Sequence, residues 1–195
     1  MSSHIDRSAY LWIFWLSIVV MSSLFQLLGW ENHLRYDRDL VAQGRYFLLY
    51  SAQLVHLNWS HWMMNMAGLV MTALLFGHRA SFWQWLLVFA VSASAVGLGL
   101  WWFDPELRWY VGLSGALHGL LVAGAIFELR HHRLSGGLLL VLLAGKVLWE
   151  QLAGPMPGSE SFIDGHVVVN SHFYGAVGGA VAALGLFVWT RFRPR

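Results

Sequence analysis

The 195-residue sequence contains no cysteine and few charged residues, 11% compared with about 25% in soluble domains. Without cysteine the chain forms no disulfide, uses no thiolate nucleophile and has no cysteine-ligated zinc. So few charges exclude an ordinary water-soluble globule, and the 57% of apolar residues excludes a disordered chain. The composition therefore indicates an integral membrane protein.

Six apolar segments have the length, or nearly the length, needed to cross a bilayer as helices, which takes about 20 residues. They lie at roughly 9–29, 59–77, 82–103, 114–127, 136–153 and 171–189. The intervals between them are short, so we predict one domain over residues 1–195. The expected fold is an all-α membrane protein, a bundle of six transmembrane helices. The first segment lacks the features of a cleaved secretory signal, so we expect it to be retained.

Basic residues are unequally divided between the two sides of this bundle. One side carries seven: Arg7, Arg79, Arg130, Arg133, Arg191, Arg193 and Arg195. The other side carries four: Arg35, Arg38, Arg45 and Arg108. The positive-inside rule then predicts that both termini are cytoplasmic and that the long loop at residues 30–57 lies outside.

The fourth segment, residues 114–127, is too short to span the bilayer. Its 14 residues would extend about 21 Å as a helix, whereas the hydrocarbon core is about 30 Å thick. Its start at Ser114 should then lie below the outer membrane surface, preceded by non-helical backbone at 110–113. Such backbone is tolerated only where protein buries it or water reaches it. We therefore expect a water-accessible cavity with Ser114 at its edge.

Ser114 stands in the sequence Gly112-Leu113-Ser114-Gly115, at the junction of a loop and a helix. Glycines allow a substrate to approach closely, and a helix start offers free N–H groups and a positive dipole end that suit an oxyanion. A serine in a membrane helix more often bonds its own backbone or packs at a helix contact. A nucleophilic serine also needs a base.

Two histidines are candidates for that base. His118 follows Ser114 by four residues and shares its helix face, so spacing alone leaves it open. His172 begins the sixth segment. Two rows of small residues follow the candidate serine and this histidine: Gly115 and Gly119, and Gly175 and Gly179. Such rows let two helices approach closely, which would bring His172 beside Ser114, and we favour His172 for this reason.

The second segment contributes His56, His61 and Asn65, with the last two on one helix face. An imidazole and an amide are donors that could stabilise an oxyanion. The competing interpretation is a zinc site, but no HExxH motif is present. The one deep carboxylate, Glu150, follows Lys146 by one turn, which favours a self-neutralising structural pair. We expect no metal and no cofactor.

Together these residues resemble the rhomboid intramembrane serine proteases over all six expected helices. Members carry HxxxxHxxxN on the second helix, GxSG at the fourth, and a histidine followed by GxxxG on the sixth, as this sequence does at His56, Gly112 and His172. The resemblance implies that Ser114 is the nucleophile and His172 the general base, a dyad without an aspartate. It also implies an oxyanion hole of His61, Asn65 and the Ser114 N–H. His118 matches a tyrosine position that packs on the catalytic histidine, which implies a supporting role.

A narrower resemblance is to the rhombosortase branch. It is carried by GLSGALHG around Ser114, HLNWSHW around His61, KxxxEQ at Lys146 to Gln151, and the short chain. This branch implies a protease of the Gram-negative inner membrane whose partners are secreted proteins held in the bilayer by a Gly-rich, hydrophobic and basic C-terminal tail; nucleic acid is not expected. In one departure from rhomboids, Phe47-Leu48 replaces the usual Trp-Arg pair.

Three other functions remain open. The first is a general rhomboid protease that acts on other single-span substrates. The second is an inactive rhomboid-like protein that binds membrane segments, although such relatives usually lack the serine or the histidine. The third is a small transporter or metal carrier that uses the histidines.

Overall fold

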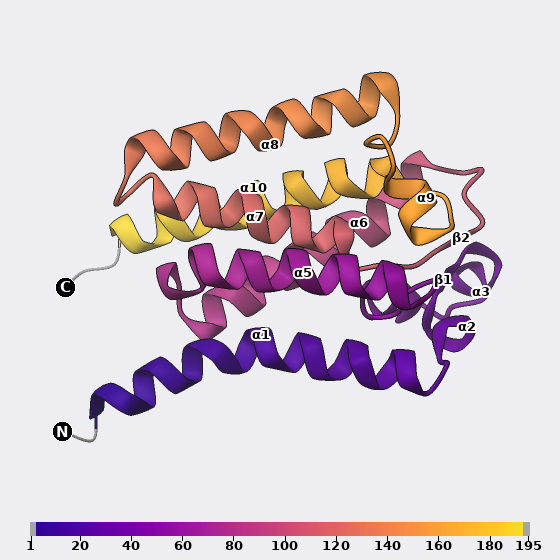
Figure 1. Ribbon diagram of the computed structural model, residues 1–195, viewed down its shortest axis with the longest axis horizontal. Coiled ribbons are helices and arrows are strands. Elements are labelled where there is room, and N and C mark those ends of the chain that lie inside the picture. Colours follow the sequence, from indigo (N-terminus) through magenta and orange to yellow (C-terminus); the bar gives the residue numbers. More distant parts are fainter. Residues whose placement is uncertain (1–2, 193–195) are drawn as a thin grey trace.

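The computed structural model describes residues 3–192, and the side chains of residues 12–189. The protein is mostly helical, at 77%, and within the described range six long helices lie side by side (Figure 1). They are α1 (Ser3–Leu27), α5 (Trp59–Phe76), α6 (Phe82–Phe103), α7 (Ser114–Glu128), α8 (Arg133–Ala153) and α10 (Val169–Phe192). These bounds follow the six expected segments closely, except that α1 begins at Ser3 rather than at residue 9.

Three helices in the described part of the chain are both long and apolar enough to cross a membrane. They are α6, α8 and α10. Helix α7 has 15 residues and is short for a span, as its sequence predicts. Many large apolar side chains face outward, among them Leu134, which is 87% exposed. The chain is therefore an integral membrane protein, because a soluble surface would not carry so many exposed apolar side chains.

Helix α7 lies at the centre of the bundle, where it packs against α5, α6, α8 and α10. Its closest partner is α10, and glycines account for the close approach. A Cβ at Gly175 would overlap the carbonyl of Gly115, and a Cβ at Gly179 would overlap that of Gly119. The two expected rows of small residues therefore face each other.

Helix α8 is the least covered of the long helices. It packs mainly on α7 and lies along one side of the bundle (Figure 1). Over its whole described length only Gly136 and Glu150 are buried. A glutamate is thus one of two buried residues on a helix whose other residues are partly or fully exposed.

Short elements connect the long helices. They are α2 (Glu31–Leu34), β1 (Tyr36–Asp37), α3 (Arg38–Ala42), α4 (Leu48–Ser51), η1 (Ala52–Leu54), η2 (Gly77–Arg79), β2 (Trp109–Tyr110) and α9 (Ser159–Ile163). Strand β1 pairs antiparallel with β2, with Tyr36 opposite Tyr110. Because β2 leads directly to Ser114, this pairing anchors the backbone that enters α7. In place of the rhomboid Trp-Arg pair, Phe47 is exposed and Leu48 is buried.

Two charged side chains, Arg38 and Asp104, fix the loop after α6 by hydrogen bonds. The guanidinium of Arg38 donates to the carbonyls of Leu100, Trp101, Asp104 and Leu107 at 2.8–3.1 Å. The carboxylate of Asp104 accepts from Asn170 and, at 2.8 Å, from the hydroxyl of Tyr174. The hydrogen bonds of Asp104 connect the end of α6 to the first turns of α10, where His172 lies.

The loops divide between the two ends of the bundle. The start of α1 and the end of α10 lie at the same end, together with the turns at 77–81 and 129–132 (Figure 1). The loops at 28–58, 104–113 and 154–168 lie at the opposite end. The prediction from the positive-inside rule assumes the same division of the loops between two sides. Arg193 and Arg195 of that count lie outside the described residues, as do the side chains of Arg7 and Arg191.

The contact between α7 and α10 predicts a large difference between two glycines of α10. Gly179→Ala should destabilise the protein by about 1–3 kcal/mol, because the new methyl group overpacks the contact with Gly119. Gly185→Ala is the matched control, since no described atom lies within 4 Å of its added methyl group. Thermal unfolding in detergent measures both, and equal melting temperatures for the two variants would contradict this account of the packing.

Candidate active site

The backbone before Ser114 is irregular and buried, and both backbone polar groups of Gly112 are paired within the protein. Gly112 adopts a φ of +122°, a conformation that favours glycine. Its N–H donates to the carbonyl of Ala52 at 2.9 Å, and its carbonyl accepts from the Tyr110 hydroxyl at 2.8 Å. This pairing is how non-helical backbone is tolerated at depth. Helix α7 then begins at Ser114, as the sequence predicts.

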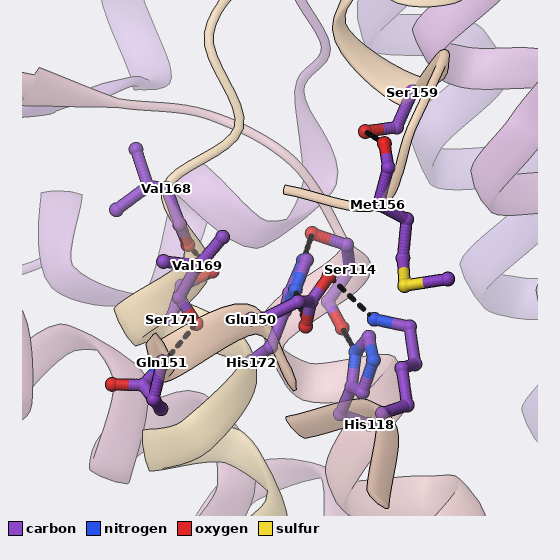
Figure 2. Close-up of polar contacts among 11 residues, drawn as sticks. Ser114, His118, Glu150, Gln151, Met156, Ser159, Val168, Val169, Ser171 and His172 are labelled. Carbon is purple, nitrogen blue, oxygen red and sulfur yellow. Dashed lines mark hydrogen bonds and ion pairs between the residues drawn. The ribbon is translucent and has the colours of Figure 1, made fainter. Parts of the chain in front are cut away.

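Ser114 and His172 form a direct contact. Nε2 of His172 lies 2.9 Å from Oγ of Ser114 (Figure 2). His172 lies in the first turns of α10, is 5% exposed, and is brought to α7 by the facing glycines. The distance is within the range required for proton transfer between a nucleophile and a base.

A third side chain lies behind the imidazole. Oε2 of Glu150 lies 2.9 Å from Nδ1 of His172 (Figure 2). The Nζ of Lys146 lies 2.7 Å from Oε1 of Glu150. The expected ion pair of Lys146 and Glu150 is therefore present, but Glu150 also contacts His172. The contact between Glu150 and His172 was missed by sequence reasoning. The available signal was that Glu150 is the only acidic residue in the expected fifth helix.

His118 supports His172 from below. Its ring stacks on that of His172 with centroids 4.2 Å apart and planes 19° apart. Its Nδ1 lies 2.7 Å from the backbone carbonyl of Ser114 and therefore carries the proton that it donates to this oxygen. The spacing of the sequence left His118 open as the base. The structure favours His172, because His172 contacts the Ser114 hydroxyl whereas His118 contacts the Ser114 carbonyl.

The same cluster offers three metal-ligating side chains. Ligand atoms of His118, Glu150 and His172 lie within 4.8 Å of one another. The Glu150 carboxylate is paired with Lys146 and with His172, and Nδ1 of His118 is paired with a carbonyl. A metal ion would have to displace the ammonium group and at least one of these hydrogen bonds. These side chains therefore fit a hydrogen-bonded network better than a metal centre.

His56, His61 and Asn65, expected together on the second segment, have different positions in the structure. His61 and Asn65 are 7% and 2% exposed and line the same cavity as Ser114. Gly112 lies close against them, since a Cβ there would be 2.7 Å from Cε1 of His61. His56 lies in the loop before α5, with its ring edge-on to that of His61 and its Nδ1 3.3 Å from Oγ of Ser22. His56 therefore supports His61 and does not line the cavity.

The cavity has a volume of about 460 Å³. Ser114 and His172 lie in its wall, together with Trp109 of β2 and Ile163 of α9, so it lies at the end of the bundle where those elements meet. Above Ser114 and His172, the Ser159 hydroxyl donates to the carbonyl of Met156 at 2.6 Å and closes the turn that begins α9 (Figure 2). The expected cavity with Ser114 at its edge is present.

Comparison with known proteins supports the rhomboid resemblance that the motifs indicate. The family model of the Rhomboid domain matches residues 43–189, which include α5 to α9, α10 as far as residue 189, and Ser114, His118, Lys146, Glu150 and His172. A search of curated proteins found no match. Because the matched region covers most of the chain, this protein belongs to the rhomboid family, whose members are generally intramembrane serine proteases.

Proposed function

We propose that this protein is an intramembrane serine endopeptidase with Ser114 as the nucleophile and His172 as the general base. The observation that carries the proposal is the 2.9 Å contact between Oγ and Nε2 at the wall of a cavity. The buried, hydrogen-bonded imidazole is oriented to take the hydroxyl proton. Family membership supports the same chemistry.

The reaction would proceed by acyl transfer. Oγ of Ser114 attacks the carbonyl carbon of the scissile peptide while its proton moves to Nε2 of His172. The tetrahedral intermediate then breaks its C–N bond, and His172 returns the proton to the leaving amine. Water attacks the resulting ester, passes a proton through His172 to Oγ, and releases the new carboxyl terminus. These steps need no metal ion or cofactor.

His61 and Asn65 would stabilise the oxyanion together with the N–H of Ser114. Both side chains line the cavity beside Gly112, the residue that a substrate backbone would approach. Preorganised donors of this kind act strongly where water is excluded. The Nδ2 of Asn65 is held at 3.2 Å from the carbonyl of His61, which leaves its second hydrogen for a substrate oxygen.

The substrate class that we propose is that of the rhombosortase branch. These substrates would be secreted proteins with a C-terminal tail of a Gly-rich motif, a hydrophobic helix and basic residues. Support comes from the motifs around Ser114, His61 and Glu150. Cleavage near the glycines would release the protein from the inner membrane of a Gram-negative bacterium. Processing of unrelated single-span proteins instead would favour a general rhomboid protease.

The test of activity compares Ser114→Ala and His172→Ala with wild type, co-expressed with a Gly-rich C-terminal-anchor substrate. Both variants should lose substrate release, and Ser114→Ala should also lose labelling by a fluorophosphonate. Ser17→Ala is the control, because that hydroxyl bonds its own helix backbone at 2.7 Å. Unchanged processing in both site variants would remove the enzymatic proposal. Substrate binding without release by wild type would indicate the non-catalytic alternative.

The effect of Asn65→Ala on kcat tests the proposed oxyanion hole. Asn65→Ala should lower kcat by about 100-fold with little change in KM, because the lost donor acts mainly in the transition state. The control is Thr72→Ala, which removes a buried polar group two turns further along α5, where Oγ1 donates to the Gly68 carbonyl. Purified enzyme and a peptide substrate give both constants. Equal kcat values for wild type and Asn65→Ala would contradict this role.

We also propose that all six long helices span the membrane with both termini in the cytoplasm. Support comes from the grouping of loops at the two ends of the bundle and from the excess of basic residues at one of them. The chain lacks cysteine, so a single exposed cysteine reports its own side. In intact cells a membrane-impermeant maleimide should label Gln43→Cys, and it should label His131→Cys only after permeabilisation. The reverse pattern would overturn this orientation.

A further inference from the structure

Glu150 occupies the position from which it can control the base. We infer that Glu150 is a positioning residue that holds His172 in the tautomer able to accept the proton of Ser114, with Lys146 holding Glu150 in turn. This inference rests on the proposed function and goes beyond it, because the rhomboid resemblance implies a dyad with no acidic partner.

The geometry defines the tautomer. Nδ1 of His172 lies 2.9 Å from a carboxylate oxygen, which accepts hydrogen bonds and cannot donate them when ionised. Nδ1 therefore carries the ring proton. Nε2 is left with its lone pair, directed at the Ser114 hydroxyl at 2.9 Å. Without a partner for Nδ1, the imidazole could place its proton on either nitrogen, and only one of these forms is a base for Ser114.

The burial of the pair points to the same role. The side chain of Glu150 is 2% exposed and that of His172 6%, whereas that of Lys146 is 33% exposed. A simple ion pair with Lys146 would gain nothing from burying its carboxylate so much more deeply than its ammonium, since charge burial is costly. The contact with His172 accounts for the depth. When Ser114 gives up its proton, the carboxylate also lies beside the imidazolium that forms.

Lys146 restricts how Glu150 can be replaced. Its ammonium has only donors, and it lies 2.7 Å from Oε1. In Glu150→Gln the amide oxygen would therefore face Lys146, and the amide NH₂ would face Nδ1 of His172. The imidazole would then accept at Nδ1 and carry its proton on Nε2, which is the wrong tautomer for a base. In serine proteases an amide in place of the acid lowers kcat about 10⁴-fold by this route.

The experiment measures kcat, KM and the fluorophosphonate labelling rate of the purified full-length protein. Glu150→Gln should lower kcat and labelling by at least about 100-fold with KM little changed. Adding Lys146→Met should recover at least about tenfold of this loss, because the amide can then turn its oxygen toward Nδ1. A purely structural ion pair predicts no such recovery in the kcat of folded protein.

The matched control is Glu128→Gln. Glu128 is also a buried glutamate, in a two-point ion pair with Arg79 at 2.6 and 3.1 Å, but it lies at the far end of α7 from Ser114. This control should lower the melting temperature and leave the kcat of the folded enzyme within about threefold of wild type. Loss of a buried ion pair is thereby separated from loss of the contact with His172.

Three results would overturn the inference. They are a kcat of Glu150→Gln within threefold of wild type, a double variant no faster than Glu150→Gln, and an equal loss of kcat in Glu128→Gln. If Glu150→Gln does not fold, Glu150→Leu combined with Lys146→Met, which removes both charges and leaves Nδ1 of His172 without its acceptor, is compared with wild type, and equal kcat values overturn the inference. Activity that survives Ser114→Ala would instead overturn the proposed function, so the two failures are distinguishable.

Discussion

The site depends on the close contact between α7 and α10. Ser114 begins one helix and His172 lies in the first turns of the other, so their distance is set by how nearly the two axes approach. Glycines on both faces remove the side chains that would otherwise separate the helices. In lipid there is little hydrophobic force between helices, and close backbone packing supplies much of the attraction. The same contact therefore holds the bundle together and assembles the reactive pair.

A second feature is the placement of charge inside an apolar bundle. The carboxylate of Glu150 is buried on α8 between an ammonium group and an imidazole. Each member reduces the cost of burying the others, which an isolated charge at this depth would pay in full. At the other end of α7, Arg79 and Glu128 also reduce the cost of burying their charges, because they pair with each other. The two pairs differ because only one of them reaches a side chain at the cavity.

Much of the architecture could be predicted from the sequence. Long apolar runs marked α5, α6 and α7 almost to the residue and α10 to within three residues, because a membrane helix is defined by the length of its apolar segment. The approach of His172 to Ser114 was predicted from small residues at helical spacing, since such rows let two helices approach closely. The family is confirmed by the Rhomboid domain match. The number of spans and the side on which the termini lie stay predictions.

The missed features depend on rotation and tilt, which an apolar sequence does not specify. Nothing in the run of leucines around Glu150 shows which face of α8 turns inward, so its ion pair with Lys146 was predicted and its contact with His172 was not. The pairing of Tyr36 with Tyr110 was also missed, because strands of two residues have no detectable alternation. The hydrogen bonds of Arg38 to backbone carbonyls leave no pattern in the sequence either.

The sparse packing of α8 makes the protein sensitive to its surroundings. This helix presents most of its side chains outward, so its inclination is held by few contacts within the protein, mainly those with α7. A bilayer that is thicker or thinner than its apolar length is matched by changing that inclination. Because a hydrogen bond weakens within a few tenths of an ångström, such a change at Glu150 alters its hold on His172. The thickness of the host membrane thus becomes a determinant of how well the imidazole is aligned.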